Sequence, residues 1–599
     1  MNSKREPSTK DSRIILLGMG LILLGVITAK VHAEDYLNLP VVKPVISCDQ
    51  LGKADLSSAV SAAVTIQSAV VTDTAKGQFC RITGNIEPGT IFEVDLPLEH
   101  WTQRLLGNPS NVMMIADAPS CAPAQNGEFV TAYDNQGHTG TGMEDASWTP
   151  NLQMRIDWAY RSNHETALAA KALIKAFYGQ PQRFSYFIGC SEGGRQALVE
   201  AQRFPEDYDG VVAGSPRTLD THRDLFGQTW EGHINRRADG SRILVSSRTG
   251  IIHDALILHC AAKSGVLDGV LQDPSACKFD PAWVQCPAGA TDTTKCLTAE
   301  EANVAQKLFE GSSDNAGHRF DVGMRIGGGL MLGGPPNMPA NTGSAKEANA
   351  AKPQEMPGSM SGKLGADIRR LLPPPESDKS AVELGSEFSL NQEWFDKLKV
   401  LAPLYNAANT NLRPFEKHGG KLILWGGAQD GLLPIDYYDA VVKYLGFQET
   451  DTFTRLFALP GVGHCMGGDN PSQFDLLTPI MAWTELHRAP AKIVAGKVTS
   501  GQGGQEGTGV ANGPSSAWEA HSPLATPSEA TVYTRPVFPY PYIAHYAGKG
   551  DPNDEASYEP VRSGAVVPEF PDVQTMKLFA PDNQKFYHVE NGQLVPDAK

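Results

Sequence analysis

Two parts of the chain alternate short apolar runs with stretches of helical periodicity. In residues 128–217 the pattern predicts strands at 129–133, 184–188 and 211–213, and helices at 164–178 and 194–204. The pattern returns after residue 415, with strands at 421–425 and 454–459 and helices at 437–445 and 474–486. Strands that alternate with helices are typical of a parallel sheet covered by helices, so the expected fold class is α/β.

Between these two parts the pattern is irregular. Residues 218–415 contain helical pieces at 247–262 and 298–309 and a Gly-, Pro- and Met-rich stretch from 323 to 362. A long irregular segment inside a domain indicates a lid or an insertion, and local disorder is the alternative for residues 335–362. We therefore expect a core split into 34–217 and 416–561, a large inserted lid domain at 218–415, and a polar C-terminal extension of unassigned role at 562–599.

The first 33 residues have the features of a secretory signal peptide. Four basic side chains precede an apolar run at 14–29, and Val31-His32-Ala33 provides a small-x-small cleavage site. An uncleaved membrane anchor is the alternative, but the run is short for a membrane span. We expect residues 1–33 to be removed, the mature chain to be secreted or periplasmic, and no membrane contact to remain.

Charge and cysteine spacing narrow the range of partners. Without residues 1–33 the chain has 46 basic and 65 acidic side chains, a net charge of −19. Such a chain repels nucleic acid and anionic membrane surfaces, so neither is an expected partner. The nine cysteines include no Cys-x-x-Cys pair, which argues against a zinc site. A small neutral or aromatic substrate remains compatible with this composition.

Gly189-Cys190-Ser191-Glu192-Gly193 matches the motif G-x-S-x-G. The motif alone is weak, because a Gly-rich chain can contain it by chance, but here it lies between a predicted strand and a predicted helix. That context is the nucleophile elbow of α/β-hydrolases, so Ser191 is the candidate nucleophile. The helix N-terminus that follows would stabilise a developing oxyanion. A plain Gly-rich turn is the alternative.

A serine nucleophile needs a histidine base and a carboxylate that orients the histidine. In α/β-hydrolases they follow in the order Ser, acid, His. Asp430 comes just after the predicted strand 421–425, and His464 just after the predicted strand 454–459. Both positions are at the carboxyl ends of strands, where α/β sheets place their sites. The predicted catalytic triad is therefore Ser191, Asp430 and His464, with Asp436 as the alternative acid.

Two cysteines lie directly beside two of these residues. Cys190 precedes Ser191 and Cys465 follows His464, so a hydrogen bond between Ser191 and His464 would make the two sulfur atoms neighbours. We expect a disulfide between them. By closing the long loop between the two cysteines, it would stabilise the folded state by roughly 5 kcal/mol in the chain-entropy model. Two buried free thiols are the alternative.

Over most of residues 45–560 the sequence resembles the tannase and feruloyl esterase family. The segments that carry the resemblance are 134–139, 145–148, 177–179, 189–195, 201–210, 460–465 and 535–541. The resemblance implies an α/β-hydrolase core with an inserted lid and the hydrolysis of galloyl, feruloyl and other hydroxycinnamoyl esters. Mono(hydroxyethyl) terephthalate hydrolases are also similar.

The resemblance also implies particular site residues. The backbone N–H of Glu192 would be one oxyanion donor, and Cys190 would be bonded to Cys465. The other disulfides implied are Cys48–Cys80, Cys260–Cys277 and Cys286–Cys296, which leaves Cys121 as the unpaired thiol.

Two segments depart from the family pattern. The family's calcium segment has three aspartates, and residues 260–269 of this chain keep only Asp268, with Lys263 nearby. Because calcium takes about six to eight oxygen ligands, we expect calcium binding to be absent or weak and no cofactor to be required. In the loop for the second oxyanion donor, Pro109 has no N–H to donate, so Ser110 and Asn111 are the candidates.

The sequence therefore predicts a carboxylic ester hydrolase that acts on a small aromatic ester through an acyl-enzyme. A serine hydrolase of other specificity, and a catalytically weakened binding protein on the same fold, are the alternatives. Arg369 and Arg370 are candidates for binding a substrate carboxylate, although solvated surface charges are the favoured interpretation.

Overall fold

The computed structural model describes most of the chain after residue 34. The described residues are 35–109, 121–138, 147–239, 241–261, 270–324, 326, 360–428, 430, 434–465, 473–498, 531–563 and 572–598. The chain divides into two compact units, Met1–Glu34 and Asp35–Lys599, and all described residues belong to the second. The predicted signal peptide lies outside the described residues. None of the described helices has the length and apolar character that a membrane span requires.

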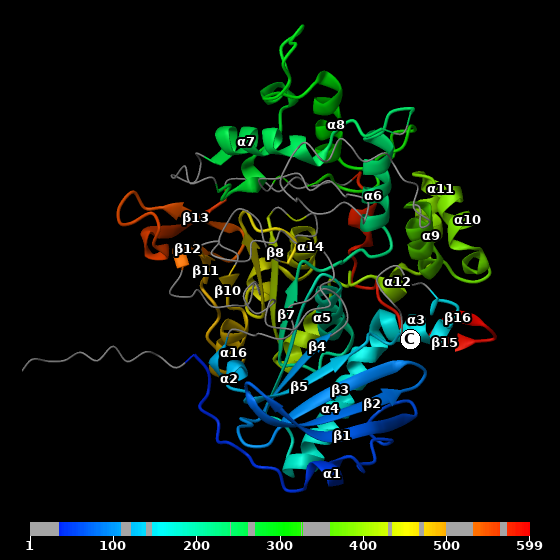
Figure 1. Cartoon of the computed structure of the whole chain (residues 1–599), viewed down its shortest axis with the longest axis vertical. Helices are drawn as coiled ribbons and strands as arrows, with labels where there is room; N and C mark the ends of the chain where they lie inside the picture. Colours follow the sequence, from blue (N-terminus) through cyan, green and yellow to red (C-terminus); the bar gives the residue numbers. More distant parts are fainter. Residues whose placement is uncertain are drawn as a thin grey trace, which may run out of the picture. The chain divides into compact units, whose positions relative to one another are not determined.

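A mixed sheet, with nine strands among the described residues, forms the centre of the fold (Figure 1). The strands lie in the order β1-β2-β3-β5-β4-β6-β7-β8-β9. The pairs along β1, β2, β3 and β5 are antiparallel, and the pairs from β5 to β9 are parallel. The bounds are β1 Val64–Thr74, β2 Gly77–Ile86, β3 Thr90–Pro97, β4 Arg104–Pro109, β5 Phe129–Asp134, β6 Phe184–Cys190, β7 Gly210–Gly214, β8 Lys421–Gly427 and β9 Thr454–Leu459.

The central parallel strands are apolar at nearly every position because helices cover both faces of the sheet. Successive side chains of a strand point to opposite faces. Val211 of β7 therefore packs with α5 (Glu192–Arg203) and α14 (Ile435–Leu445), while Val212 packs with α16 (Leu477–Leu486). The strands expected from apolar runs in the sequence correspond to β5, β6, β7, β8 and β9.

Helix α4 (Ser162–Tyr178) covers the antiparallel part of the sheet. Its apolar face packs in one cluster with buried residues of β2, β3 and β5, including Leu173, Ile82 and Val94. α4 continues directly from α3 (Leu152–Ile156) through a π-helical turn at Asp157–Arg161. The remaining short helices of the core are α1 Cys48–Leu51, α2 Ala122–Gln125 and α15 Phe447–Thr450.

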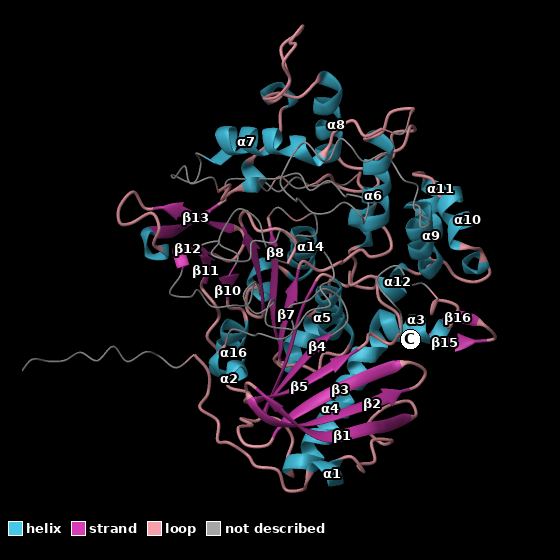
Figure 2. Ribbon diagram, in the orientation of Figure 1, coloured by secondary structure: helices cyan, strands magenta, loops and turns pink. Residues whose placement is uncertain are grey.

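Residues 218–415, the predicted lid, contribute no strand to the large sheet in their described part. Helices α6, α7 and α8 lie beyond one end of the parallel strands (Figures 1 and 2). α7 and α8 correspond to the helical pieces expected from the sequence, and they enclose an apolar cluster of their own. The bounds in and after this region are α6 Arg223–Ile234, α7 Thr249–Cys260, α8 Ala299–Glu310, α9 Met360–Leu371, α10 Ala381–Glu387, α11 Gln392–Lys399, α12 Ala402–Tyr405 and α13 Arg413–His418.

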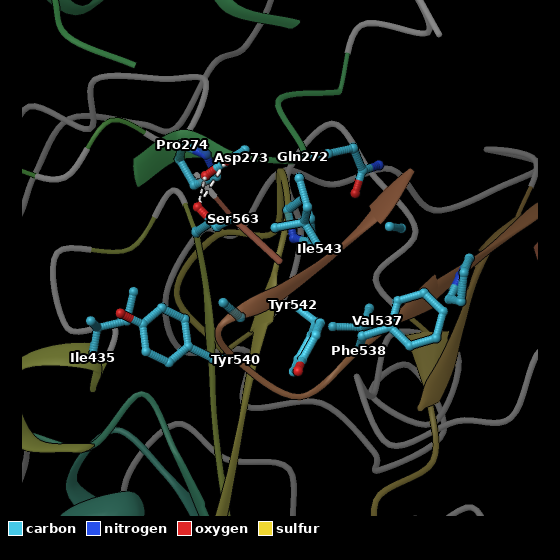
Figure 3. A pocket seen from close by; sticks show the side chains of 15 residues that line it. Gln272, Asp273, Pro274, Ile435, Val537, Phe538, Tyr540, Tyr542, Ile543 and Ser563 are labelled. Carbon is cyan, nitrogen blue, oxygen red and sulfur yellow. Dashed lines mark hydrogen bonds between the residues drawn. The ribbon is translucent and has the colours of Figure 1, made fainter. Parts of the chain in front are cut away.

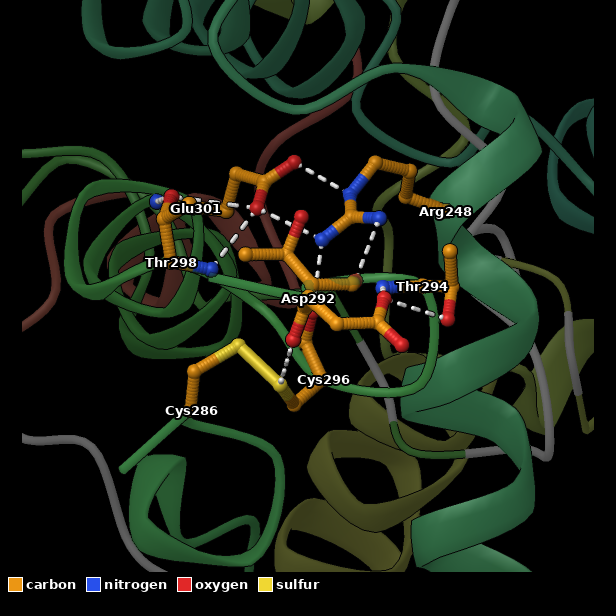
Figure 4. The surroundings of a disulfide bond; sticks show 8 residues. Arg248, Cys286, Asp292, Thr294, Cys296, Thr298 and Glu301 are labelled. Atoms are coloured by element: carbon orange, nitrogen blue, oxygen red, sulfur yellow. Dashed lines mark hydrogen bonds and ion pairs between the residues drawn. A yellow bond between two sulfur atoms is a disulfide. The ribbon is translucent and has the colours of Figure 1, made fainter. Parts of the chain in front are cut away.

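A disulfide and an arginine hold one loop of this region against α8 (Figure 4). Cys286 is bonded to Cys296. Arg248 donates to the backbone oxygen of Cys296 at 2.6 Å and forms an ion pair with Glu301 of α8. Glu301 also accepts from the backbone N–H of Thr298, which completes the capping box at the start of α8. The loop is therefore fixed both covalently and by charge.

The C-terminal extension contacts both the core and the 218–415 region. Its Thr575 hydroxyl donates to Asp321 at 2.6 Å. In the core, the Tyr160 hydroxyl donates to the backbone oxygen of Tyr587 at 3.1 Å and accepts from its N–H at 2.9 Å. The end of the extension forms a hairpin of β15 (Tyr587–Glu590) and β16 (Gln593–Pro596).

The Tyr160 hydroxyl provides a test of this attachment. Tyr160→Phe leaves a buried N–H and a buried carbonyl of Tyr587 without their partner, which costs about 1–3 kcal/mol. We expect the free energy of unfolding in urea to fall by that amount. Tyr542→Phe, at a hydroxyl-bearing side chain that is 44% exposed, is the control and should stay within about 0.5 kcal/mol of the wild type. Equal losses in both variants would contradict the assignment.

His222, just before α6, predicts how stability depends on pH. The ring is fully buried and its Nε2 lies 3.0 Å from the backbone oxygen of Phe395. Burial lowers the pKa of His222 to about 4, whereas the unfolded chain keeps a value near 6.5. As the pH falls from about 6.5 to 4, the unfolded state takes up a proton that the folded state does not. The free energy of unfolding therefore falls by about 3 kcal/mol across this pH range.

His222→Gln should remove this part of the pH dependence. The measurement is the free energy of unfolding in urea at pH 7 and at pH 4.5. His100→Gln, which replaces an exposed histidine, should keep the wild-type dependence. A wild-type slope retained in His222→Gln would show that this histidine is not the group responsible.

Candidate active site

Ser191 lies on the tight turn between β6 and α5. Its φ of 61° and ψ of −119° form a backbone conformation that non-glycine residues rarely adopt. The Ser191 N–H donates to the backbone oxygen of Gly214 on β7 at 2.9 Å, which holds the turn against the next strand. A Cβ at Gly189 would lie 2.3 Å from the backbone oxygen of Gly193, so the turn has no room for a side chain there. The structure thus contains the strand–turn–helix that the motif predicts.

The structure brings together the three residues of the predicted triad. His464 Nε2 lies 2.8 Å from Ser191 Oγ, and His464 Nδ1 lies 2.8 Å from Asp430 Oδ2. The side chain of Asp430 is 7% exposed and that of His464 is 28% exposed. In this arrangement Nδ1–H donates to the carboxylate and Nε2 accepts from the serine hydroxyl. The histidine is the most accessible of the three, as a group that exchanges protons with a substrate must be.

The loops that carry the acid and the histidine follow the adjacent parallel strands β8 and β9. They approach each other so closely that a Cβ at Gly427 would lie 2.1 Å from the backbone oxygen of Val462. Gly427 ends β8, three residues before Asp430, and Val462 is two residues before His464. The short distance between Asp430 and His464 therefore depends on a glycine at the end of the strand.

Asp436, the alternative acid, lies elsewhere. It is in the first turn of α14 and its carboxylate lies 3.0 Å from Arg223 Nη2, which also pairs with Asp321. Its side chain is 3% exposed. Asp436 thus joins the core to the 218–415 region through an ion pair, whereas Asp430 is the carboxylate beside His464.

The predicted disulfide beside the triad is present. Cys190 and Cys465 are bonded with their Cα atoms 6.0 Å apart, and the bond spans 275 residues. It joins the residue before Ser191 to the residue after His464. The other pairings implied by the resemblance are also present, namely Cys48–Cys80, Cys260–Cys277 and Cys286–Cys296. Cys121 is a buried free thiol, and burial raises its pKa.

Glu192, the expected oxyanion donor, is the first residue of α5. The N–H groups of the first turn of a helix have no partner within the helix, so the role of the Glu192 N–H, next to Ser191, stays a prediction that this position allows. Ser110 and Asn111, the candidates for the second donor, lie outside the described residues, as do residues 262–269 of the calcium segment. Among the described residues, no three or more His, Cys, Asp and Glu side chains gather as a metal site would require.

The interpretation of Arg370 as a solvated surface charge was wrong. Its side chain is 7% exposed, and Nη1 lies 2.6 Å from Asp220 Oδ2. The guanidinium also lies 4.1 Å from the ring centre of Trp158. Arg369 is half-buried and donates to the backbone oxygen of Ser377 at 3.0 Å. Sequence reasoning did not place Arg370 in this way, because its partner Asp220 is 150 residues away.

A pocket lies beside the loops of Asp430 and His464 (Figure 3). Ala428 and Pro460 of these loops line it, and so does Asp273, which accepts a hydrogen bond from Ser563 at 2.9 Å. Neither Ser191 nor His464 is among its described lining residues. The small sheets near it are formed by β10 Gln473–Phe474, β11 Ile493–Val498 and β12 Thr531–Val537, and by β13 Tyr542–Tyr546 and β14 Tyr558–Arg562.

A model of the family described as tannase and feruloyl esterase matches residues 71–561. The chain belongs to this family. The match includes the elbow, both loops of the predicted triad and the whole 218–415 region. It ends at residue 561, just before the C-terminal extension. Family membership identifies the chain as a carboxylic ester hydrolase.

Individual family members differ considerably in sequence from this chain. An uncharacterized esterase of Xanthomonas campestris is 27% identical over 521 residues, which cover 80% of this chain and 84% of the relative. Mono(2-hydroxyethyl) terephthalate hydrolase of Piscinibacter sakaiensis is 28% identical over 522 residues, covering 78% and 80%. The crystal structure of feruloyl esterase B from Aspergillus oryzae is 21% identical with a TM-score of 0.63, covering 86% and 100%. This likeness in fold confirms the predicted α/β class.

The disulfide at the elbow should matter for both stability and hydrolysis. In the chain-entropy model, the bond Cys190–Cys465 is worth about 5 kcal/mol and the bond Cys286–Cys296, which spans 10 residues, about 3 kcal/mol. We expect Cys190→Ala/Cys465→Ala to lower the melting temperature more than Cys286→Ala/Cys296→Ala. Only the first pair should also reduce kcat toward an ester, because only it ties the elbow to the histidine loop. Equal kcat values in the two double variants would refute this role.

Proposed function

We propose that this chain is a secreted or periplasmic serine carboxylesterase that hydrolyses small aromatic esters. The observation that carries the proposal is the hydrogen-bonded chain Ser191–His464–Asp430, with 2.8 Å at each step. A hydroxyl becomes a strong nucleophile when a correctly oriented imidazole accepts its proton, and this geometry provides that base.

The proposed reaction has two steps through an acyl-enzyme. Ser191 Oγ attacks the ester carbonyl while His464 Nε2 accepts the hydroxyl proton, and Asp430 stabilises the imidazolium through Nδ1–H. The N–H of Glu192 donates to the oxyanion of the tetrahedral intermediate. His464 then gives the proton to the departing alcohol. A water molecule, activated by the same imidazole, attacks the acyl-enzyme and releases the carboxylic acid.

The aromatic specificity is supported by the names of the relatives. Two relatives, each 28% identical to this chain, have names that refer to esters of aromatic acids. They are mono(2-hydroxyethyl) terephthalate hydrolase and a probable feruloyl esterase of Arthroderma benhamiae. We assign the pocket for the acyl group to the 218–415 region acting as a lid over the carboxyl ends of the strands. Export is supported by the predicted signal peptide and by four disulfides, which persist in oxidising compartments.

A panel of aromatic methyl esters, including methyl ferulate and methyl gallate, tests the proposal. The wild type should hydrolyse at least one of them, and Ser191→Ala should lower kcat by about 10³-fold or more. Asp430→Asn should lower kcat by about 10⁴-fold, because the histidine loses its orienting carboxylate. Asp436→Asn is the matched control. It should reduce thermal stability through the loss of the Arg223 ion pair while Ser191 stays reactive.

A fluorophosphonate probe separates the alternatives, because it labels an activated serine without regard to the substrate. It should label the folded wild type and leave Ser191→Ala unlabelled. A folded wild type that resists labelling would favour a binding protein on the same fold. Labelling together with peptide cleavage and no turnover of the panel would favour a serine hydrolase of other specificity.

A further inference from the structure

A group of charged side chains extends from the residue after Ser191 into the 218–415 region. We call it the elbow charge cluster, and its members are Glu192, Arg195, Arg217, Asp220 and Arg370. Arg195 pairs with Glu192 at 2.6 Å. Asp220 pairs with Arg217 at 2.9 Å and with Arg370 at 2.6 Å. Four of the side chains are at most 7% exposed, whereas that of Arg217 is 24% exposed.

The two carboxylate oxygens of Glu192 have different surroundings. Oε1 accepts hydrogen bonds from Arg195 Nε at 2.7 Å and from Gln196 Nε2 at 3.2 Å. Oε2 is buried and accepts no hydrogen bond from the residues that the structure describes. Arg217 Nη1 lies 3.7 Å from Oε2, at ion-pair distance. Arg195 thus compensates one side of the carboxylate, and Arg217 faces the other.

The charge of Glu192 matters because of its position. The same residue provides the N–H that we assign to the oxyanion. During the reaction its carboxylate is therefore close to a second negative charge, the oxyanion that forms at the neighbouring residue Ser191. Like charges repel each other more strongly in a buried site than in water, since the effective dielectric constant is lower. An uncompensated carboxylate on Glu192 would therefore raise the energy of the tetrahedral intermediate.

The fold holds Arg217 at this place. Gly214, the last residue of β7, accepts the hydrogen bond of the Ser191 N–H, and Arg217 follows three residues later. Asp220 anchors its guanidinium. Burial alone would raise the pKa of Asp220, but Arg370 and Arg217 lower it to about 2. The anchor therefore stays ionised at neutral pH, and a planar guanidinium can address two carboxylates at once.

We propose that Arg217 is a positioning residue of the esterase, which neutralises the Oε2 side of Glu192 so that the Glu192 N–H can bind an oxyanion without repulsion. This inference rests on the proposed function, because it assumes that Ser191 is acylated and that Glu192 donates to the oxyanion. Asp220 and Arg370 keep Arg217 in place, and none of the three contacts the substrate.

A double-mutant cycle tests the proposal on any aromatic methyl ester that the wild type hydrolyses. Arg217→Gln should lower kcat about tenfold or more and change KM less than about twofold. It should also raise the apparent pKa on the acidic side of the kcat/KM profile, because a carboxylate that is compensated by Arg195 alone favours the imidazolium form of His464 more strongly. In Glu192→Gln/Arg217→Gln, where the carboxylate is gone as well, both parameters should return to those of Glu192→Gln.

Arg217→Lys keeps the positive charge but lacks the planar guanidinium. The apparent pKa on the acidic side of its kcat/KM profile should therefore match that of the wild type even where kcat falls. This variant also serves if Arg217→Gln does not fold. Arg413→Gln, which removes a surface arginine paired with Glu449 at 2.7 Å, is the control and should leave the profile unchanged. Melting temperatures verify that every variant is folded.

Two results would overturn the inference. One is a wild-type kcat and pH profile in Arg217→Gln, and the other is the same loss of kcat in Arg217→Gln and in the double variant, which would indicate a structural role alone. Failure of the proposed function looks different. In that case the wild type would neither turn over the panel nor react with the fluorophosphonate, so no cycle could be measured.

Discussion

The hydrogen bond between His464 Nε2 and Ser191 Oγ joins side chains 273 residues apart, and the chemistry depends on it. The backbone around both side chains fixes the geometry of this hydrogen bond. Ser191 and Cys465 both have a positive φ, of 61° and 62°, which costs of order 1–3 kcal/mol each for residues with a side chain. Such conformations persist only where the surroundings fix them. Here the bond Cys190–Cys465 joins the two strained turns, and the next strand accepts the N–H of Ser191.

The parallel sheet explains why these residues could be identified from the sequence. Strands β6, β8 and β9 are largely apolar, and each is followed by a glycine-rich turn that carries one member of the predicted triad. Because parallel strands end at the same edge, a local pattern at three separate places implies that the three turns are close together. The covalent pairing of Cys190 with Cys465 followed from the same reasoning, since each is adjacent in sequence to a residue of the triad.

The sequence could not decide where the charged side chains pair. Asp430 and Asp436 are six residues apart in similar sequence contexts. Their roles differ because Asp436 pairs with Arg223, which lies more than 200 residues earlier in the chain. The sequence predicts Arg370 to be a surface charge, because its partner Asp220 is 150 residues away. Local periodicity contains no information on such pairs. The same limit applies to the C-terminal extension, whose polar sequence gave no indication that Tyr587 binds a buried tyrosine of the core.

Helix α5 shows how the site and its surroundings depend on one another. All twelve of its residues are buried, although it contains four ionisable side chains. Burying a charge is costly unless it is paired or hydrogen-bonded. Arg195 meets this requirement through Glu192 and the backbone oxygen of Tyr405, and Arg203 through the backbone oxygens of Pro403 and Lys585.

The backbone partners belong to α12, at the end of the 218–415 region, and to the C-terminal extension. Moving either of them away from α5 would expose a charge of this helix to solvent or leave it buried without its hydrogen-bond partner. This helix begins at the nucleophile. We therefore expect α12 and the extension to stay fixed against the core during the reaction. If residues 218–415 act as the predicted lid, any opening would then be confined to the parts of this region that do not contact α5.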